Sequence, residues 1–252
     1  MRSRLAAGLA ALCVLALFLL FTWPAERWLS GLPEPLAVQA PEGTLWRGQA
    51  AVLAAGPLRF ESLRWRLRPA SLVLGRLGFR LTTGSPAIEA RIAAGLTGRW
   101  WLRMPRAELP AEFFRPLLDR WGIEASGRLL IRELAASGRG DWPDRLEGAL
   151  VWKSAALAAP LNLPLGDLQV RLRGEGDALL AEMQDQGGPL ALAGSARLER
   201  DGHYRLDLKL RARADAARAL RDALGLLGAP DASGDHRLTL VGRLPRQIVG
   251  AD

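Results

Sequence analysis

The 252-residue sequence contains one cysteine and two histidines, and this scarcity limits the chemistry that the protein can perform. The single cysteine, Cys13, rules out a disulfide within the chain and any Cys-x-x-Cys metal or redox motif. The two histidines, His203 and His236, do not have the spacing of a metal-binding pair. A phosphate-binding glycine loop is also absent, because Gly174-Glu-Gly176 is not continued by further motif residues.

Nucleophiles and carboxylates give no stronger indication of an active site. The segment Ala193-Gly-Ser-Ala196 comes nearest to a nucleophile elbow, but it lacks the second glycine and lies in a strand pattern. Glu182 and Asp185 are close in sequence, yet nothing near them distinguishes them from solvated surface acids. The sequence therefore predicts a protein that is not an enzyme, with no catalytic residue, no metal and no cofactor.

Charged residues are absent from one long segment at the N-terminus. Residues 1–4 contain two arginines, whereas the 19 residues from 5 to 23 contain no charge. As a helix this segment would span about 28 Å, enough to cross the hydrocarbon core of a membrane. It lacks the small-x-small site of a cleavable signal peptide and ends at Trp23, a residue type common at membrane interfaces. We expect an uncleaved transmembrane anchor, with a cleaved signal peptide as the alternative. The apolar residues expected to form the anchor are Leu5, Leu9, Leu12, Val14, Leu15, Leu17, Phe18, Leu19, Leu20, Phe21 and Trp23.

The two arginines before the anchor favour a cytoplasmic N-terminus over residues 1–4. Residues 24–42 would then connect the anchor to a periplasmic domain, and the protein would be a single-pass protein of the cell inner membrane. This placement changes the meaning of the net charge of +8. A basic cytoplasmic protein would suggest nucleic acid, but a periplasmic domain does not normally meet it. Anionic lipid and acidic protein partners are the better candidates.

Beyond residue 43 the apolar residues recur at every second position, which is the period of a half-buried strand. In residues 202–213 the apolar residues alternate with arginine, lysine and aspartate. Asp201-Gly202 stands between this run and the alternating run before it, and predicts a two-residue hairpin turn. At Ser62 the alternation changes parity, which predicts a bulge or a break between two strands. The sequence thus predicts a mainly β protein, an antiparallel meander. Further strands are expected at residues 63–68, 168–173, 190–199 and 238–244.

Two segments have the helical period instead. Residues 215–228 place apolar side chains at helical spacing, with Asp215 as the expected N-cap and Gly228 as the stop. Residues 110–122 predict a second amphipathic helix, in which Pro116 must kink the chain or end the first turn.

These helices reveal two similar halves. The first half opens at Gly43-Thr-Leu-Trp-Arg-Gly-Gln-Ala50 and the second at Gly148-Ala-Leu-Val-Trp-Lys-Ser-Ala155. In each half a helix is followed by Ala-Ser-Gly, ending at Gly127 and Gly234, and by another strand. We therefore expect β-meander halves at residues 43–136 and 148–252, joined by a junction at 137–147 and sharing one continuous sheet.

The strand arginines are expected to point outward. Arg64, Arg66 and Arg68 alternate with apolar residues, as do Arg171 and Arg173. Such charges keep a sheet soluble and discourage edge pairing. The alternative is a basic face held near anionic lipid or an acidic partner.

The order of these landmarks resembles the type II secretion system protein N family. The resemblance covers nearly the whole chain, from the N-terminal anchor to Leu224-Gly-Leu-Leu-Gly-Ala-Pro-Asp231. The opening Gly-x-Leu-Trp-x-Gly element also looks like that of AsmA-type periplasmic proteins, so the order and total length carry the resemblance. The motif positions are Gly43, Leu45, Trp46, Gly48, Trp65, Pro69, Gly148, Trp152, Gly166, Leu168, Gly187, Gly188 and Tyr204.

The resemblance implies a non-catalytic, membrane-tethered accessory component of the general secretion pathway, which exports folded proteins through an outer-membrane secretin. The partners it implies are other components of that machine, in the inner-membrane platform and at the secretin. A sheet with unpaired edges is suited to binding by β-augmentation. The alternative is a lipid-handling protein of the AsmA kind, with an open apolar groove that shields acyl chains.

Overall fold

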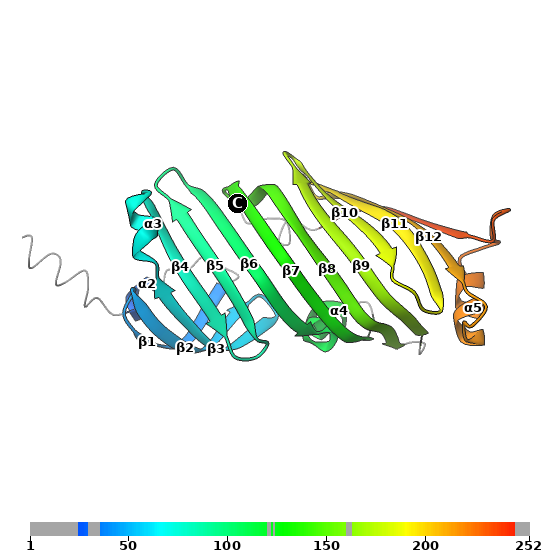
Figure 1. Ribbon diagram of the computed structural model, residues 1–252, viewed down its shortest axis with the longest axis horizontal. Helices are drawn as coiled ribbons and strands as arrows, with labels where there is room; N and C mark the ends of the chain where they lie inside the picture. The colour runs from blue at the N-terminus through cyan, green and yellow to red at the C-terminus, as the bar shows by residue number, and fades with distance from the viewer. Residues whose placement is uncertain (1–24, 30–35, 120–121, 123, 160–162, 245–252) are drawn as a thin grey trace, which may run out of the picture.

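The computed structural model describes residues 25–29, 36–119, 122, 124–159 and 163–244. In these residues thirteen strands form one sheet, and their order across the sheet is their order along the chain. Every neighbouring pair is antiparallel, so the predicted meander is confirmed (Figure 1). The strands are β1 (Leu36–Gly43), β2 (Arg47–Ala55), β3 (Leu58–Leu67), β4 (Arg76–Thr83), β5 (Ile88–Gly95), β6 (Arg99–Pro110), β7 (Glu124–Arg139), β8 (Trp142–Ala159), β9 (Leu163–Glu175), β10 (Ala178–Asp185), β11 (Leu190–Glu199), β12 (His203–Ala212) and β13 (His236–Arg243).

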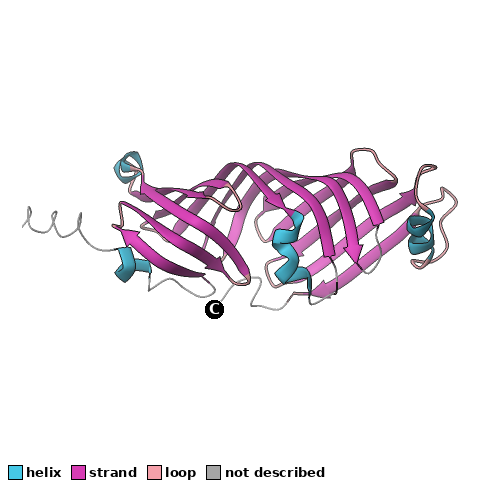
Figure 2. Ribbon diagram, turned by 90° about the horizontal axis from the view of Figure 1, so that it is seen from below, coloured by secondary structure: helices cyan, strands magenta, loops and turns pink. Residues whose placement is uncertain are grey.

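Short helices lie at the ends and beneath the middle of this elongated sheet (Figure 1). They are α2 (Ala25–Leu29), α3 (Pro69–Val73), the 3-10 turn η1 (Ala111–Phe114), α4 (Arg115–Leu118) and α5 (Arg218–Gly225). The sheet arches, and α4 stands in the hollow of the arch (Figure 2). We call the face that α2, η1 and α5 contact the inner face, and the opposite face the outer face.

Alternation along the strands sends most apolar side chains to the inner face and most charged ones to the outer face. On β12, Leu210 is 7% exposed, whereas Lys209 and Arg211 on either side are exposed. The pairing register carries this division across the sheet, because Leu210 lies opposite Leu192 of β11. The sheet is therefore one continuous two-faced layer.

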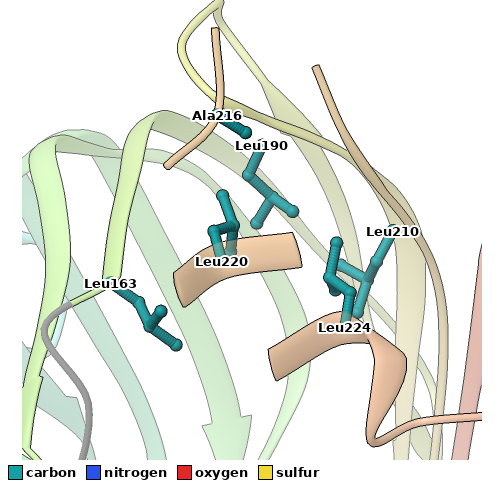
Figure 3. Packing of buried hydrophobic residues seen from close by; sticks show 6 residues of the cluster. All are labelled: Leu163, Leu190, Leu210, Ala216, Leu220 and Leu224. Carbon is teal, nitrogen blue, oxygen red and sulfur yellow. The ribbon is translucent and has the colours of Figure 1, made fainter. Parts of the chain in front are cut away.

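The largest buried cluster lies where α5 packs on the inner face (Figure 3). Leu220 and Leu224 are one turn apart on α5 and point at Leu190 and Leu210 of the sheet. Leu220 is 2% exposed, and burying such a side chain contributes roughly 1.5–3 kcal/mol. A smaller cluster at the other end joins Ala25 of α2 to Ala50, Leu63 and Trp65.

The 3-10 turn η1 links the middle of the chain to the first strands. The rings of Phe113 and Phe60 lie 5.2 Å apart between centroids, and the Phe113 and Phe114 rings meet edge to face at 5.4 Å. In contrast, α3 lies on the outer face. A side chain at Gly78 of β4 would collide with Ser71 of α3, and Gly78 lies opposite the outward-facing Ala93 of β5.

Both predicted helices are shorter than the periodicity indicated. The segment at 110–122 is a 3-10 turn followed by one α-helical turn. Pro116 has no backbone amide proton to continue a helix from the residues before it, so it lies in the first turn of α4, where proline is tolerated. The segment at 215–228 is helical only from Arg218 to Gly225, with Ala217 at the N-cap. Asp215 is not the cap, since a turn closed by the Ala216 amide and the Arg213 carbonyl precedes the helix.

The parity change at Ser62 is real, but the structure shows neither a break nor a register shift. Strand β3 runs through it, with Glu61 opposite Val52 and Leu63 opposite Ala50. Ser62 has a φ of 53°, and this single left-handed residue turns the following side chains to the other face. The hairpin predicted at Asp201-Gly202 is present between β11 and β12, but its turn is longer than the two residues predicted. Residues 200–202 connect β11 to β12, and Gly202 with a φ of 90° ends the turn.

The two sequence segments expected to open the halves occupy different places. Gly43 ends β1 at a hairpin turn, whereas Gly148 lies inside β8 opposite Leu172. Gly127 likewise lies inside β7, whereas Gly234 lies in a turn before β13. The shared alternation of apolar residues is common to any half-buried strand, so it does not fix structural equivalence.

Among the described residues, no helix is both long and apolar enough to cross a membrane. The residues of the predicted anchor, 5–23, lie outside the described part of the chain.

Candidate interaction surfaces

The motif glycines and tryptophans form tight cross-strand contacts. Gly43 has a φ of 94°, and a side chain there would lie 2.6 Å from the Arg47 carbonyl and 2.9 Å from Cα of Gly48. The Trp65 indole covers Gly48 and donates its Nε1 proton to the Thr44 carbonyl at 3.0 Å. These residues therefore fix the β1–β2 hairpin against β3, which is a structural role.

The second half contains a contact of the same form. Gly166 has a φ of 90°, and a side chain there would lie 2.6 Å from the Gly187 carbonyl and 3.0 Å from Cα of Gly188. The structural counterpart of Gly43 is thus Gly166. The sequence did not reveal this equivalence, because the paired glycines are separated by a hairpin turn in one half and by a complete strand in the other.

Indole hydrogen bonds to strand ends and turns recur along the sheet. Trp152 donates to the Ser126 carbonyl at 3.0 Å and covers Gly127. Two further bonds join Trp100 to Gly140 at 2.8 Å and Trp142 to Gly176 at 3.0 Å. The remaining motif residues contribute to packing. Leu45 and Trp46 are half-buried, Leu168 is buried, and Pro69 begins α3. Gly148 faces Leu134, and Tyr204 lies over Gly242.

The ionisable groups do not assemble into a catalytic constellation in the part of the chain that the structure describes. No three His, Cys, Asp or Glu side chains there come together as a metal site. His203 Nδ1 lies 2.6 Å from Asp201 Oδ2 on an exposed turn. A backbone hydrogen bond from His203, and then its side-chain bond, hold the pKa of Asp201 below its ordinary value. His236 Nδ1 lies 2.9 Å from the Gly228 carbonyl.

Asp185 is not the solvated acid that the sequence indicated. Its carboxylate accepts hydrogen bonds from the amides of Leu192 and Gly187 and from Arg213, whose Nη2 lies 2.5 Å away. Burial raises the pKa of Asp185, but the Leu192, Arg213 and Gly187 bonds together outweigh it and leave the pKa below its ordinary value. Asp185 therefore fixes the turn between β10 and β11, while Glu182 remains exposed.

The outer face of β2–β6 carries an uninterrupted row of arginines. Arg47 lies opposite Arg66, Arg66 opposite Arg80, Arg80 opposite Arg91, and Arg91 opposite Arg103. We call these five residues the arginine row. Like charges directly opposite one another destabilise a sheet. Within the described residues the row makes one ion pair, from Arg80 to Glu89 at 3.6 Å.

The outer face near β11–β13 has the opposite character. Arg197 and Arg205 also lie directly opposite one another. Each has its own carboxylate two positions along the strand, with Arg197 3.2 Å from Glu199 and Arg205 3.4 Å from Asp207. The balance of charge differs in the same way between the two proposed halves. Residues 43–136 contain 15 basic and 7 acidic residues, whereas residues 148–252 contain 14 basic and 13 acidic residues.

The two outermost strands offer the other candidate surface. Within the described residues β1 pairs only with β2, and β13 pairs only with β12. On β13, Leu240 is 45% exposed and Val241 is 66% exposed. Since the Leu244 amide donates to Gly202 of the β11–β12 turn, alternation directs the Val241 amide away from β12. This edge can accept a further strand.

The fold and its surfaces define an elongated, two-faced β-meander protein with an arginine-rich outer face over β2–β6. A family model described as "Type II secretion system (T2SS), protein N" matches residues 34–239. The chain therefore belongs to the type II secretion system protein N family, and the resemblance seen in the sequence is confirmed.

Two relatives carry the name Type II secretion system protein N. The protein from Aeromonas hydrophila is 27% identical over 238 residues, covering 90% of this chain and 93% of the relative. The protein from Vibrio cholerae serotype O1 is 25% identical over 256 residues, covering 97% of this chain and all of the relative. No solved structure matches the chain significantly.

Proposed function

We propose that this protein is a non-catalytic accessory component of the type II secretion system, anchored in the inner membrane by residues 5–23. Its periplasmic sheet supports export of folded proteins by contacting other components of the machine, in the inner-membrane platform and at the secretin. Family membership supports the place in secretion. The hydrophobic composition of residues 5–23 supports the anchor.

The main support for the proposed mode of binding is the unpaired edge of β13. Its outward amides and its exposed Leu240 and Val241 offer backbone hydrogen bonds and apolar contact together. These are the two elements of strand addition, in which main-chain bonds give affinity and side-chain contacts give specificity. A partner strand would extend the thirteen-stranded sheet at this edge.

The test replaces one edge residue in the full-length protein. Val241→Pro removes an outward amide without removing a bond to β12, whereas the control Val241→Thr keeps that amide. In a strain that lacks the native gene, the proline variant should fail to restore exoprotein release and the threonine variant should restore it. Normal secretion in the deletion strain would refute the proposed function. Equal rescue by both variants would refute strand addition at the edge of β13.

A second candidate function rests on the inner face. Leu77 and Ile92 lie on this face and are 45% and 37% exposed, and α5 and η1 cover other parts of it. An open apolar face of this kind would suit a lipid-handling protein that shields acyl chains. Native mass spectrometry of the detergent-extracted protein distinguishes this function, which requires lipid to co-purify.

A further inference from the structure

A hollow of about 590 Å³ lies between α3 and the outer face of β4–β8. Arg68 and Arg76 line it beside α3, and Arg91 and Arg103 of the arginine row line it from the sheet. Arg91 Nε is buried there and has no hydrogen-bond partner. A buried donor without a partner costs free energy, so an acceptor that enters the hollow would relieve that cost.

The hollow is apolar as well as basic. Leu74 and Trp101 form part of its wall, and the Arg76 guanidinium lies 3.9 Å above the centre of the Trp101 ring. One carboxylate, Glu147, also lines it. The remaining charges are positive, and the walls offer both guanidinium groups and hydrocarbon. This combination fits an anionic headgroup that is joined to an apolar chain.

The adjoining tip of the molecule exposes large apolar side chains. Val73 is 89% exposed, Leu74 69% and Leu72 42%, all in or next to α3. Leu96 is 95% exposed in the β5–β6 turn. It follows Gly95, which lies opposite Arg76 at the start of β4, so the two segments share one end of the β4–β5 pair.

The chemistry of two adjacent arginines favours phosphate over carboxylate. One guanidinium fork satisfies both oxygens of a carboxylate, whereas a phosphate group has further oxygens that a second fork can bind. Arg91 and Arg103 lie directly opposite one another, so they are placed to bind one phosphate together.

We propose that the α3 tip docks on an anionic phospholipid bilayer and that the hollow beneath it binds a lipid phosphate. Leu72, Val73, Leu74 and Leu96 enter the interface, and Arg91 and Arg103 bind the headgroup. Both α2 and α3 lie at the same end of the sheet (Figure 1), and α2 begins two residues after the proposed anchor ends at Trp23. The inference rests on the proposed anchor, which would hold this end of the domain near the membrane.

The first experiment places a fluorophore on the tip of the full-length protein. With Cys13→Ser as background, NBD is attached at Val73→Cys or, as control, at Leu226→Cys, which is 83% exposed at the α5 end. The labelled proteins are reconstituted in vesicles of phosphatidylcholine with or without phosphatidylglycerol and brominated acyl chains. Emission at position 73 should shift to the blue and be quenched in the anionic vesicles, while position 226 should be unchanged. Equal quenching at both positions would overturn the proposal.

The second experiment measures the phosphate site in neutral detergent. Short-chain phosphatidylglycerol is titrated with the NBD reporter at position 73. Since each basic residue near an anionic surface changes binding by about fivefold, the double variant Arg91→Gln, Arg103→Gln should weaken binding by roughly 25-fold. The matched pair Arg197→Gln, Arg205→Gln should change it less than twofold. If the two double variants weakened lipid binding equally, the proposed phosphate site at Arg91 and Arg103 would be overturned.

Three further outcomes identify the source of the anion. Equal binding of short-chain phosphatidylcholine would overturn the need for an anionic headgroup. If inorganic phosphate bound as tightly as the lipid, the proposal that the hollow binds a phospholipid would be overturned. Tighter binding of poly-glutamate would instead assign the hollow to an acidic protein partner. Resistance of the full-length protein to carbonate extraction tests the anchor separately, so failure of the tip and failure of the anchor are distinguishable.

Discussion

The outer face of β2–β6 and the outer face of β11–β13 are both lined by arginine, but within the described residues the arginine row of the first forms a single ion pair, between Arg80 and Glu89. Arg197 and Arg205 are each paired along their own strand, whereas Arg66, Arg91 and Arg103 have no ion pair within the described residues. The same alternating strand pattern thus produces a nearly neutral surface at one end and a strongly basic one at the other. We keep the proposed division into residues 43–136 and 148–252, since this difference in charge follows it.

The inner faces differ as well. Helix α5 covers its end of the sheet with Leu220 and Leu224, while at the other end Ala25 of α2 packs against Ala50, Leu63 and Trp65. We infer that a helix packed on the sheet contributes more apolar packing to the second half than to the first, whereas close glycine contacts occur in both halves. The predictions below test this difference, beginning with the largest expected effect.

Leu220→Ala should lower the free energy of unfolding by about 3 kcal/mol, because it leaves a cavity between α5 and the sheet. Denaturant unfolding followed by circular dichroism measures it. The control, Leu226→Ala, alters a residue on the same segment that is 83% exposed and should change stability by less than about 0.5 kcal/mol. Similar losses of unfolding free energy in the two variants would show that packing of Leu220 against the sheet does not stabilise the protein.

Gly166→Ala should cost at least about 2 kcal/mol, because it combines a left-handed φ with a collision against the Gly187 carbonyl. Gly43→Ala should cost a similar amount in the other half. Gly140→Ala is the matched control, since its φ is 64° but nothing lies within 4 Å of the added carbon, and it should cost about 1 kcal/mol. Thermal unfolding of the three variants tests whether close approach adds to backbone strain.

Asp185→Asn should cost about 2 kcal/mol near neutral pH, because it weakens bonds to Leu192, Gly187 and Arg213. The folded pKa of Asp185 is lowered, so its contribution is present above the unfolded pKa near 4 and is lost as the pH falls through the folded value. Stability measured from pH 6 to pH 2 should therefore fall more steeply in the native protein than in the variant. Parallel curves would contradict this role.

Arg66→Gln should stabilise the protein by a few tenths of a kcal/mol at low salt, because it relieves repulsion from Arg47 and Arg80. Arg197→Gln should have the opposite sign, since it removes the ion pair with Glu199. Both effects should disappear near 1 M salt, where screening acts over about 3 Å. The same sign in both variants would remove the electrostatic distinction between the halves.

Local pattern was enough to predict several features. The period of two identified β11 at the residues the structure gives it, and the outward direction of the strand arginines follows from the same alternation. Helix limits were less predictable, because Ala216 packs in the core from a turn that precedes α5. The fixed role of Asp185 was missed for a similar reason, since Arg213 lies 28 positions away in sequence.

The sequence by itself determined the β class, the two-faced strands and membership of the family, because these depend on which residue types alternate and in what order. The tertiary structure decided which residues meet. Only the register of β2–β6 aligns five arginines in one row, and only the position of α3 creates a hollow above two of them. A shift of one residue in any of those strands would send its arginine to the opposite face, so this surface depends on pairing that no local pattern specifies.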